Sequence, residues 1–206
     1  MTNEADFSTL GLSEQMLEAV RAKGFETPTS IQRLTIPRLL SGGNDIIAQS
    51  QTGTGKTAAF GLPILQQTEH SADGVQALVL VPTRELAVQA AEELLSFNAG
   101  RRLSITAIYG GAAMSEQLRR LSRGVDIVVG TPGRVLDHIR RGTLKLDKVR
   151  FLVLDEADEM LDMGFLEDVE EIMNHTGAHR RVLLFSATMP ERIVRPSEAY
   201  IPDPDL

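Results

Sequence analysis

Short apolar runs alternate with longer amphipathic stretches along most of the chain. The apolar runs are rich in β-branched residues, and they predict strands at 46–48, 77–81, 104–108, 126–129, 149–154 and 181–185. Helical patterns separate most of these runs. The clearest covers 85–97, where Leu86, Ala90, Leu94 and Phe97 fall on one face. Repeated alternation of strand and helix predicts an α/β domain with a mostly parallel sheet and helices on both faces.

Two further helices are predicted before the first strand. The first covers 13–23, where Ser13 is a good N-cap and Gly24 a stop signal. The second covers 30–40, and we expect Pro37 to bend it and the glycines at 42 and 43 to end it. No internal repeat or low-complexity tract interrupts the pattern, so we expect one domain.

Composition narrows the range of functions. The 206 residues are 42% hydrophobic, which is enough for one folded domain with a real core. We expect no membrane association, because no apolar run is long enough to cross a bilayer. The absence of cysteine excludes disulfides and thiolate metal sites, and it fits a cytoplasmic protein. A net charge of −7 argues against a broadly basic nucleic-acid binder, so any RNA contact must come from a local patch.

The segment 50–57 carries the first chemical signal, the sequence Ser-Gln-Thr-Gly-Thr-Gly-Lys-Thr between a predicted strand and a helix. Such a loop points backbone N–H groups and a helix N-terminus at phosphates, and Gly53 and Gly55 let the backbone curl. Lys56 can reach the β- and γ-phosphates, and Thr57 can offer its hydroxyl to Mg²⁺. The usual first glycine of G-x-x-x-x-G-K-[ST] is Ser50 here. The alternative is a flexible turn with a solvated lysine. On the nucleotide reading the contacts come from Ser50, Gln51, Thr52, Gly53, Thr54, Gly55, Lys56 and Thr57.

The segment 155–158, Asp-Glu-Ala-Asp, directly follows a predicted buried strand. Ligands of open α/β sheets sit at the carboxyl ends of the strands, so this segment should face the phosphate loop. Asp155 would then hold Mg²⁺ opposite Thr57, directly or through water, and Glu156 would orient and deprotonate the attacking water. Lys56, Asp155 and Glu156 are therefore the predicted catalytic residues. The alternative is an acidic helix start that favours the helix dipole.

Together these segments and several others resemble the DEAD-box family of ATP-dependent RNA helicases, from about Phe7 to about Tyr200. The family's motifs occur in family order: 24–32 (Gly-Phe-Glu-Thr-Pro-Thr-Ser-Ile-Gln) resembles the Q motif, 82–87 motif Ia, 110–111 the GG motif, 131–134 motif Ib, and 186–188 motif III. Each string alone is short, but the ordered set is highly specific. The resemblance implies a RecA-like P-loop domain that binds Mg²⁺ and ATP.

The resemblance also implies contact with the sugar-phosphate backbone of RNA, which carries little base information. The implied residues are Pro82, Thr83, Arg84, Gly110, Gly111, Thr131, Pro132, Gly133 and Arg134. Simple helix capping is the alternative for Thr83 and Thr131, and it is compatible with phosphate binding. With 4% aromatic residues and no Trp, a base-stacking platform is not expected.

Adenine recognition is expected from the Q motif. The side-chain amide of Gln32 can pair with both N6 and N7 of adenine. By resemblance, Phe25 stacks on the adenine ring and Thr27 supports the Gln32 loop. Ordinary core packing is the alternative for Phe25, and we expect Phe7 to brace the loop by packing rather than to touch ligand. The resemblance further implies that Ser186 and Thr188 hydrogen-bond Asp158 and couple the nucleotide site to RNA, the alternative being a polar turn.

The implied function is that of the ATP-binding half of an RNA helicase, which couples ATP binding and hydrolysis to duplex unwinding. We expect residues 1–33 to be the Q-motif region, 34–195 the core, and 196–206 the start of a linker or a truncated tail, with the last helix breaking near Arg195 before Pro196. A second RecA-like domain would supply arginine fingers, worth about 10³–10⁵ in rate. The chain alone is therefore expected to bind adenine nucleotide weakly and to be nearly inactive. A P-loop ATPase without helicase activity is the alternative.

Overall fold

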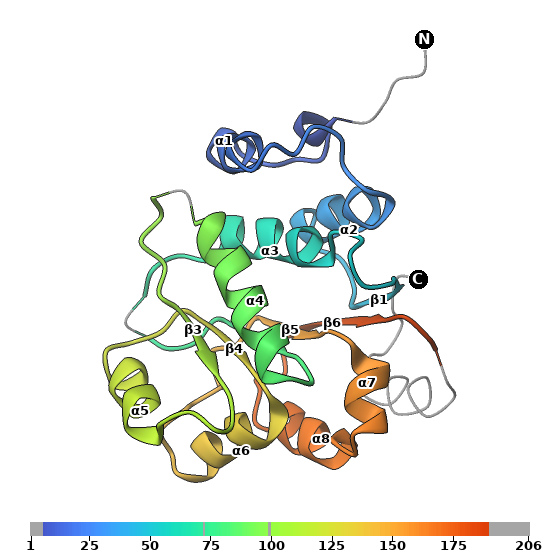
Figure 1. Ribbon diagram of the computed structural model, residues 1–206. Coiled ribbons are helices and arrows are strands. Elements are labelled where there is room, and N and C mark those ends of the chain that lie inside the picture. Colours follow the sequence, from blue (N-terminus) through green and yellow to red (C-terminus); the bar gives the residue numbers. More distant parts are fainter. Residues whose placement is uncertain (1–5, 72, 99, 190–206) are drawn as a thin grey trace.

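The computed structural model describes residues 6–71, 73–98 and 100–189, and within them a single parallel sheet forms the centre of the molecule (Figure 1). The strands are β1 (Ile46–Gln49), β2 (Ala77–Leu80), β3 (Ile105–Ile108), β4 (Ile127–Gly130), β5 (Phe151–Leu154) and β6 (Arg181–Ser186). Their order across the sheet is β1-β6-β5-β2-β4-β3, and every neighbouring pair is parallel. The predicted α/β class is confirmed.

Helices cover both faces of this sheet. They are the 3-10 turn η1 (Phe7–Thr9) and the α-helices α1 (Glu14–Ala22), α2 (Ser30–Leu40), α3 (Lys56–Gln67), α4 (Arg84–Ser96), α5 (Met114–Ser122), α6 (Pro132–Arg140), α7 (Ala157–Asp162) and α8 (Leu166–Asn174). Helices α1 to α4 lie on one side of the sheet and α5 to α8 on the other (Figure 1).

The alternation of side chains along each strand builds two separate cores. In β2, Ala77 and Val79 join the cluster under α1 to α4, whereas Leu78 and Leu80 join the cluster under α6 to α8. Both sets are buried, which is why this strand is apolar at every position. The nearly continuous apolar runs in the sequence reflect this burial on both faces.

Most predicted boundaries differ from the observed ones by one or two residues. The strand expected at 149–154 begins at Phe151, because the backbone N–H of Val149 donates to Leu146 O in a turn. Ser13 caps α1 as predicted, with its hydroxyl accepting from Met16 N. Helix α2 runs through Pro37 to Leu40. The expected break near Arg195 and the expected linker at 196–206 lie outside the described residues.

The strand order decides where the motif-bearing loops meet. In a parallel sheet all carboxyl ends lie along one edge, so the loops after β1, β6 and β5 are neighbours, and those after β2, β4 and β3 are neighbours. The first group carries the 50–57 loop, motif III and Asp155. The second group carries the residues expected to touch RNA. One edge of the sheet is thereby divided into two adjoining halves.

Candidate functional site

The loop after β1 curls through two left-handed glycines before it enters α3. Gly53 and Gly55 both have φ +81°, and Gly55 is the N-cap of α3. A Cβ built on Gly55 would clash with Nε2 of Gln32, so both the space and the left-handed backbone conformation favour glycine at this position. The loop therefore presents the N-terminus of α3 at the edge of the sheet.

Ser50, which stands in place of the usual glycine, cross-links this loop. Its backbone φ is not positive, so a side chain is tolerated there. Its N–H donates to Ser186 O at 2.9 Å, and its hydroxyl lies 2.5 Å from that of Thr54. The Thr54 hydroxyl also lies 2.7 Å from the carbonyl oxygen of Gln51. The serine side chain thus links the loop internally to Thr54, whereas the bond to β6 comes from the backbone and does not depend on the serine.

Lys56 joins this loop to the acidic segment at the end of β5. Its Nζ lies 3.0 Å from Glu156 Oε1 and 3.2 Å from Asp155 Oδ1. Thr52 donates to the same Glu156 oxygen at 3.2 Å. All three charged side chains are nearly buried: the Lys56 side chain is 5% exposed and each carboxylate side chain 11%. The two segments, about a hundred positions apart in the sequence, form one cluster across β6.

Burial and charge act against each other in this cluster. Burial lowers the pKa of Lys56, but the carboxylates of Asp155 and Glu156 outweigh it, so the net shift is upward and the ammonium stays charged. Burial also raises the pKa of Asp155, although the Lys56 charge opposes that rise. The site therefore holds one cation between two acids in a poorly solvated place. A phosphate chain that enters it would compete with both carboxylates for the Lys56 ammonium.

Glu156 is held in an uncommon backbone conformation. It has φ 54° and ψ 47°, the left-handed region, and it is the N-cap of α7. Its N–H donates to Asp155 Oδ1 at 2.9 Å. A non-glycine residue in this region persists only where its surroundings hold it, and such residues cluster at functional sites. In this conformation Glu156, like Asp155, contacts Lys56 at the end of β5.

The donor set fits Mg²⁺ that arrives with phosphates. Asp155 offers a carboxylate at the edge of the sheet, and Thr57 offers a hydroxyl from the first turn of α3. Within the described residues there is no group of three or more His, Asp or Glu side chains that could form a metal cage. Mg²⁺ is commonly held by one or two carboxylates together with substrate phosphates, so this arrangement suits it.

Gln32 lies between the Q motif and the phosphate loop, and its side chain is already engaged. Its Oε1 accepts from Thr29 N at 2.9 Å, and its Nε2 donates to Gly55 O at 3.2 Å. Thr29 and Gln32 form a capping box at the start of α2. The structure shows Thr29 supporting Gln32, and a supporting role of Thr27 stays a prediction. Each polar atom of the amide keeps one further hydrogen-bonding position, but the residue is only 2% exposed.

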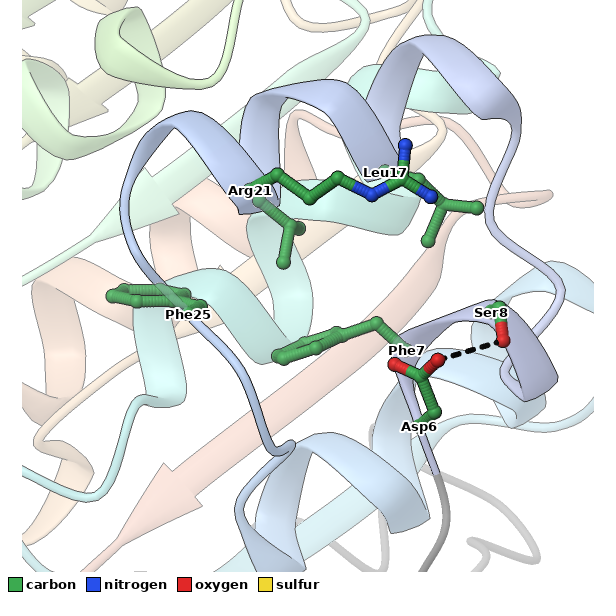
Figure 2. A pocket seen from close by; sticks show the side chains of 7 residues that line it. Asp6, Phe7, Ser8, Leu17, Arg21 and Phe25 are labelled. Atoms are coloured by element: carbon green, nitrogen blue, oxygen red, sulfur yellow. Dashed lines mark hydrogen bonds between the residues drawn. The ribbon is translucent and has the colours of Figure 1, made fainter.

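The two aromatic residues near the Q motif line the same small hollow (Figure 2). Phe7 is 2% exposed, as expected for a packing role. The half-buried Phe25 meets Phe97 edge-on, with ring centroids 6.0 Å apart. The hollow that Phe7 and Phe25 line together with Leu17 and Arg21 has a volume of about 50 Å³, far below the 300–1,000 Å³ usual for ligand pockets. The packing alternative for Phe25 is therefore realised, and its stacking on adenine stays a prediction.

Motif III lies at the end of β6, between the two halves of the nucleotide site. The hydroxyl and the N–H of Thr188 both donate to Asp158 Oδ2 at 2.9 Å. The Ser186 hydroxyl accepts from the backbone N–H of Asp158 at 3.1 Å, so it holds the backbone of that residue. Burial acts to raise the pKa of Asp158, but the hydrogen bonds from Thr188 and Ser186 prevail and lower it. The predicted contacts between motif III and Asp158 are present.

The other half of the edge brings together the residues expected to touch RNA. Thr83 caps α4 with its hydroxyl, which accepts from Leu86 N. Thr131 is the N-cap residue of α6 but makes no capping hydrogen bond, and Pro132 fills the first helical position. The capping alternative therefore holds for Thr83 and fails for the Thr131 side chain. Gly110, Gly111 and Gly133 are exposed.

The two arginines of this half are held in place. The Arg84 guanidinium lies over the ring of Tyr109, 5.1 Å from its centroid. Arg134 Nη1 donates to Ala112 O at 3.1 Å and to Gln117 Oε1 at 3.2 Å. Sequence reasoning singled out neither Tyr109 nor Gln117. The spacing of Arg134 and His138 on α6 was the only available hint of a shared network, because residues four apart share one helix face.

The fold and the paired segments define a nucleotide-binding domain of the parallel α/β, P-loop class. A profile of the DEAD/DEAH box helicase family matches residues 29–195. The chain belongs to this family, which excludes an unrelated P-loop ATPase.

Known proteins of the family align along nearly the whole chain. The chain is 52% identical over 200 residues to the DEAD-box ATP-dependent RNA helicase CshA of Geobacillus kaustophilus, covering 97% of this chain and 43% of that protein. It is 49% identical over 198 residues to a probable ATP-dependent RNA helicase of Methanocaldococcus jannaschii, covering 96% and 53%. The crystal structure of a DEAD box protein from Methanococcus jannaschii superposes with a TM-score of 0.93 at 48% identity, covering 97% of this chain and 55% of that one. The chain spans about half the length of these relatives or less.

Proposed function

We propose that this chain is the ATP-binding domain of an RNA helicase that couples Mg-ATP binding and hydrolysis to RNA backbone binding and duplex unwinding. The observation that carries the proposal is the contact of Lys56 with Asp155 and Glu156, which assembles the phosphate loop and the acidic segment into one site. Family membership and the names of the relatives support the choice of ATP and RNA.

The roles of the residues follow from their chemistry. Bound Mg-ATP supplies the phosphoanhydride that water cleaves, with the metal offsetting its charge. In our proposal Lys56 leaves the carboxylates to contact the phosphates, and Thr57 and Asp155 hold the ion. Glu156 then orients the attacking water and accepts its proton. Gln32 forms hydrogen bonds with the adenine base, and Phe25 stacks on the adenine ring. Through its bond to Gly55 O, Gln32 also links the adenine site to the phosphate loop.

RNA binding is assigned to the adjoining half of the sheet edge. Arg84 and Arg134 supply the positive charge there, and Thr131 has a side chain that capping does not use. Contacts with the sugar-phosphate backbone make binding sequence-tolerant, and contacts with the 2′-hydroxyl select RNA over DNA. The bonds between Asp158 and Thr188 lie in the nucleotide half, where the segments after β5 and β6 meet, and they provide the proposed coupling to RNA.

The remaining parts of the proposal concern the whole protein. A second RecA-like domain would complete the RNA groove and supply arginine fingers. In this proposal residues 1–33 serve as the Q-motif region, 34–195 as the core, and 196–206 as the start of a linker or a truncated tail. A cytoplasmic location agrees with the absence of cysteine. None of the described helices has the length and apolar character needed to cross a bilayer.

Nucleotide titration of the 206-residue chain tests the central claim. We expect a fluorescent ATP analogue to bind in the presence of Mg²⁺, its guanine counterpart to bind at least tenfold more weakly, and Lys56→Ala to abolish binding. Gln32→Ala should remove the preference for adenine. Equal affinity for both bases in the unsubstituted chain, or unchanged binding in Lys56→Ala, would contradict the proposal. Melting curves for each variant separate lost binding from lost folding.

A further inference from the structure

The side-chain amide of Gln117 on α5 makes three hydrogen-bonding contacts on the RNA half of the sheet edge. Its side chain is 5% exposed. Its Nε2 donates to Tyr109 O at 2.9 Å, and its Oε1 lies 3.2 Å from Arg134 Nη1 and 2.9 Å from His138 Nε2. An amide oxygen has two lone pairs, so both are occupied. This one side chain therefore connects the ends of β3 and α6.

The direction of this amide is fixed by its partners. A backbone carbonyl can only accept, so the amide nitrogen must face Tyr109 and the amide oxygen must face Arg134 and His138. Because the Gln117 oxygen can only accept, the fully buried His138 donates to it from Nε2, while its Nδ1 lies 2.9 Å from the Thr143 hydroxyl. Burial lowers the pKa of His138, which favours the neutral ring, and the contact with the Gln117 oxygen places its single proton on Nε2. The ring thus locks Gln117 in one orientation.

Both arginines of the RNA half depend on this arrangement. Gln117 holds the Arg134 guanidinium directly, next to the bond that Arg134 makes with Ala112 O. It holds Arg84 indirectly, because it fixes the backbone of Tyr109, whose ring lies under the Arg84 guanidinium. Arg134 and Arg84 come from helices that follow different strands, β4 and β2. Gln117 is thus linked to both arginines, to Arg134 by a hydrogen bond and to Arg84 through Tyr109.

We propose that Gln117 is a positioning residue for RNA binding, which sets the spacing of Arg84 and Arg134 to match neighbouring phosphates, and that His138 orients it. The inference rests on the proposed function, since it assumes that these two arginines contact RNA. Preorganised guanidinium groups lose less conformational freedom when they bind, and the gain appears as affinity. A purely structural role would lower stability without acting through the arginines.

A double-mutant cycle on RNA affinity distinguishes these roles. Binding of a fluorescein-labelled single-stranded uridine oligonucleotide is measured by anisotropy at low salt. Gln117→Leu should weaken binding roughly tenfold, the size expected for losing a hydrogen bond to a charged group. In the Arg84→Ala/Arg134→Ala background the same substitution should change affinity less than twofold. His138→Phe keeps the ring volume, and it should reproduce part of the loss.

Gln66→Leu is the matched control. The Gln66 side chain accepts from Ser13 N and donates to Gly11 O far from this edge, so its loss should lower the melting temperature and leave RNA affinity unchanged. If Gln117→Leu weakens RNA binding equally in both backgrounds, or not at all in a folded chain, the positioning role is overturned while the RNA edge stands. If Arg84→Ala/Arg134→Ala itself binds RNA normally, the proposed RNA edge fails, and this inference fails with it.

Discussion

Replacement of Lys56 by methionine should destabilise the folded chain, and the effect should depend on pH. The substitution keeps most of the side-chain volume but removes the ammonium group that lies 3.0 Å from Glu156 and 3.2 Å from Asp155. Two nearly buried carboxylates then face each other with no cation between them. The perturbation is therefore electrostatic, with little change in packing.

The expected size follows from two estimates. Removing one partner of a buried ion pair costs about 3–5 kcal/mol. The cost has a ceiling, because one carboxyl can take up a proton instead, and protonating an acid of ordinary pKa near 4 at pH 7 costs about 4 kcal/mol. Burial already raises the pKa of Asp155, which lowers that ceiling somewhat. We expect a loss of about 3 kcal/mol in the free energy of unfolding at pH 7.

The sign of the pH dependence follows from the same reasoning. Without Lys56, the charge that opposes the raised pKa of Asp155 is gone, so this pKa rises further in the folded state and the native variant binds more protons than the unfolded one. Its stability then falls as pH rises. The gap between Lys56→Met and the unsubstituted chain should accordingly be larger at pH 7.5 than at pH 5.5, by up to about 2.7 kcal/mol. Urea denaturation followed by far-ultraviolet circular dichroism measures it, since the chain has no Trp.

Lys23→Met is the matched control for this experiment. Lys23 also forms an ion pair, 3.3 Å from Glu93, but these two side chains are 30% and 31% exposed. Pairs that solvent reaches contribute about 0–1 kcal/mol, so the control should show a small loss with little pH dependence. The reasoning fails if Lys56→Met lowers the free energy of unfolding less than Lys23→Met does. It also fails if the stability difference between Lys56→Met and the unsubstituted chain grows as pH falls.

Three further predictions concern single positions. Gly55→Ala should abolish nucleotide binding and lower the melting temperature, because the new Cβ would clash with Nε2 of Gln32 and the backbone φ of +81° disfavours alanine. Unchanged binding of the ATP analogue would refute this prediction. Thr83→Ala should lose about 1 kcal/mol of stability in urea denaturation through its lost cap, whereas Thr131→Ala should lose almost none. Burial lowers the pKa of His138, so its contribution to stability is present above about pH 6.5 and lost as pH falls below it. His138→Phe should therefore flatten the stability profile between pH 6.5 and 5, by at most about 1.4 kcal/mol per pH unit; an unchanged slope would contradict a buried neutral ring.

Local patterns carried most of the fold prediction. Burial on both faces leaves strands apolar at every position, so β2 and β5 were recognisable from four or five residues. The positions of the strand ends were harder to predict, because an apolar residue such as Val149 can also be buried in a turn. Thr29 and Gln32 have the three-residue spacing of a capping box, and the structure forms this box at the start of α2. Cap residues obey local rules, whereas strand ends depend on what packs against them.

Contacts between distant segments were less accessible. Gln117 and His138 look like ordinary helix residues in the sequence, and only the packing of α5 against α6 makes them a network. Phe25 fits both an aromatic ligand contact and core packing, and its neighbour Phe97 lies far along the chain. Where a side chain has two plausible roles, only the partner that it contacts in the tertiary structure decides between them.

The residues by themselves determined the α/β class, the phosphate loop, the acidic pair and the order of the motifs, because each depends on spacing within a few positions. The tertiary structure decided that β6 lies between β1 and β5, so that Lys56 reaches Asp155 and Glu156 across motif III. It also decided that β2, β4 and β3 gather the arginine-bearing loops on the adjoining half of the edge. Strand order is set by how helices pack on both faces of the whole sheet, and no local period in the sequence encodes it.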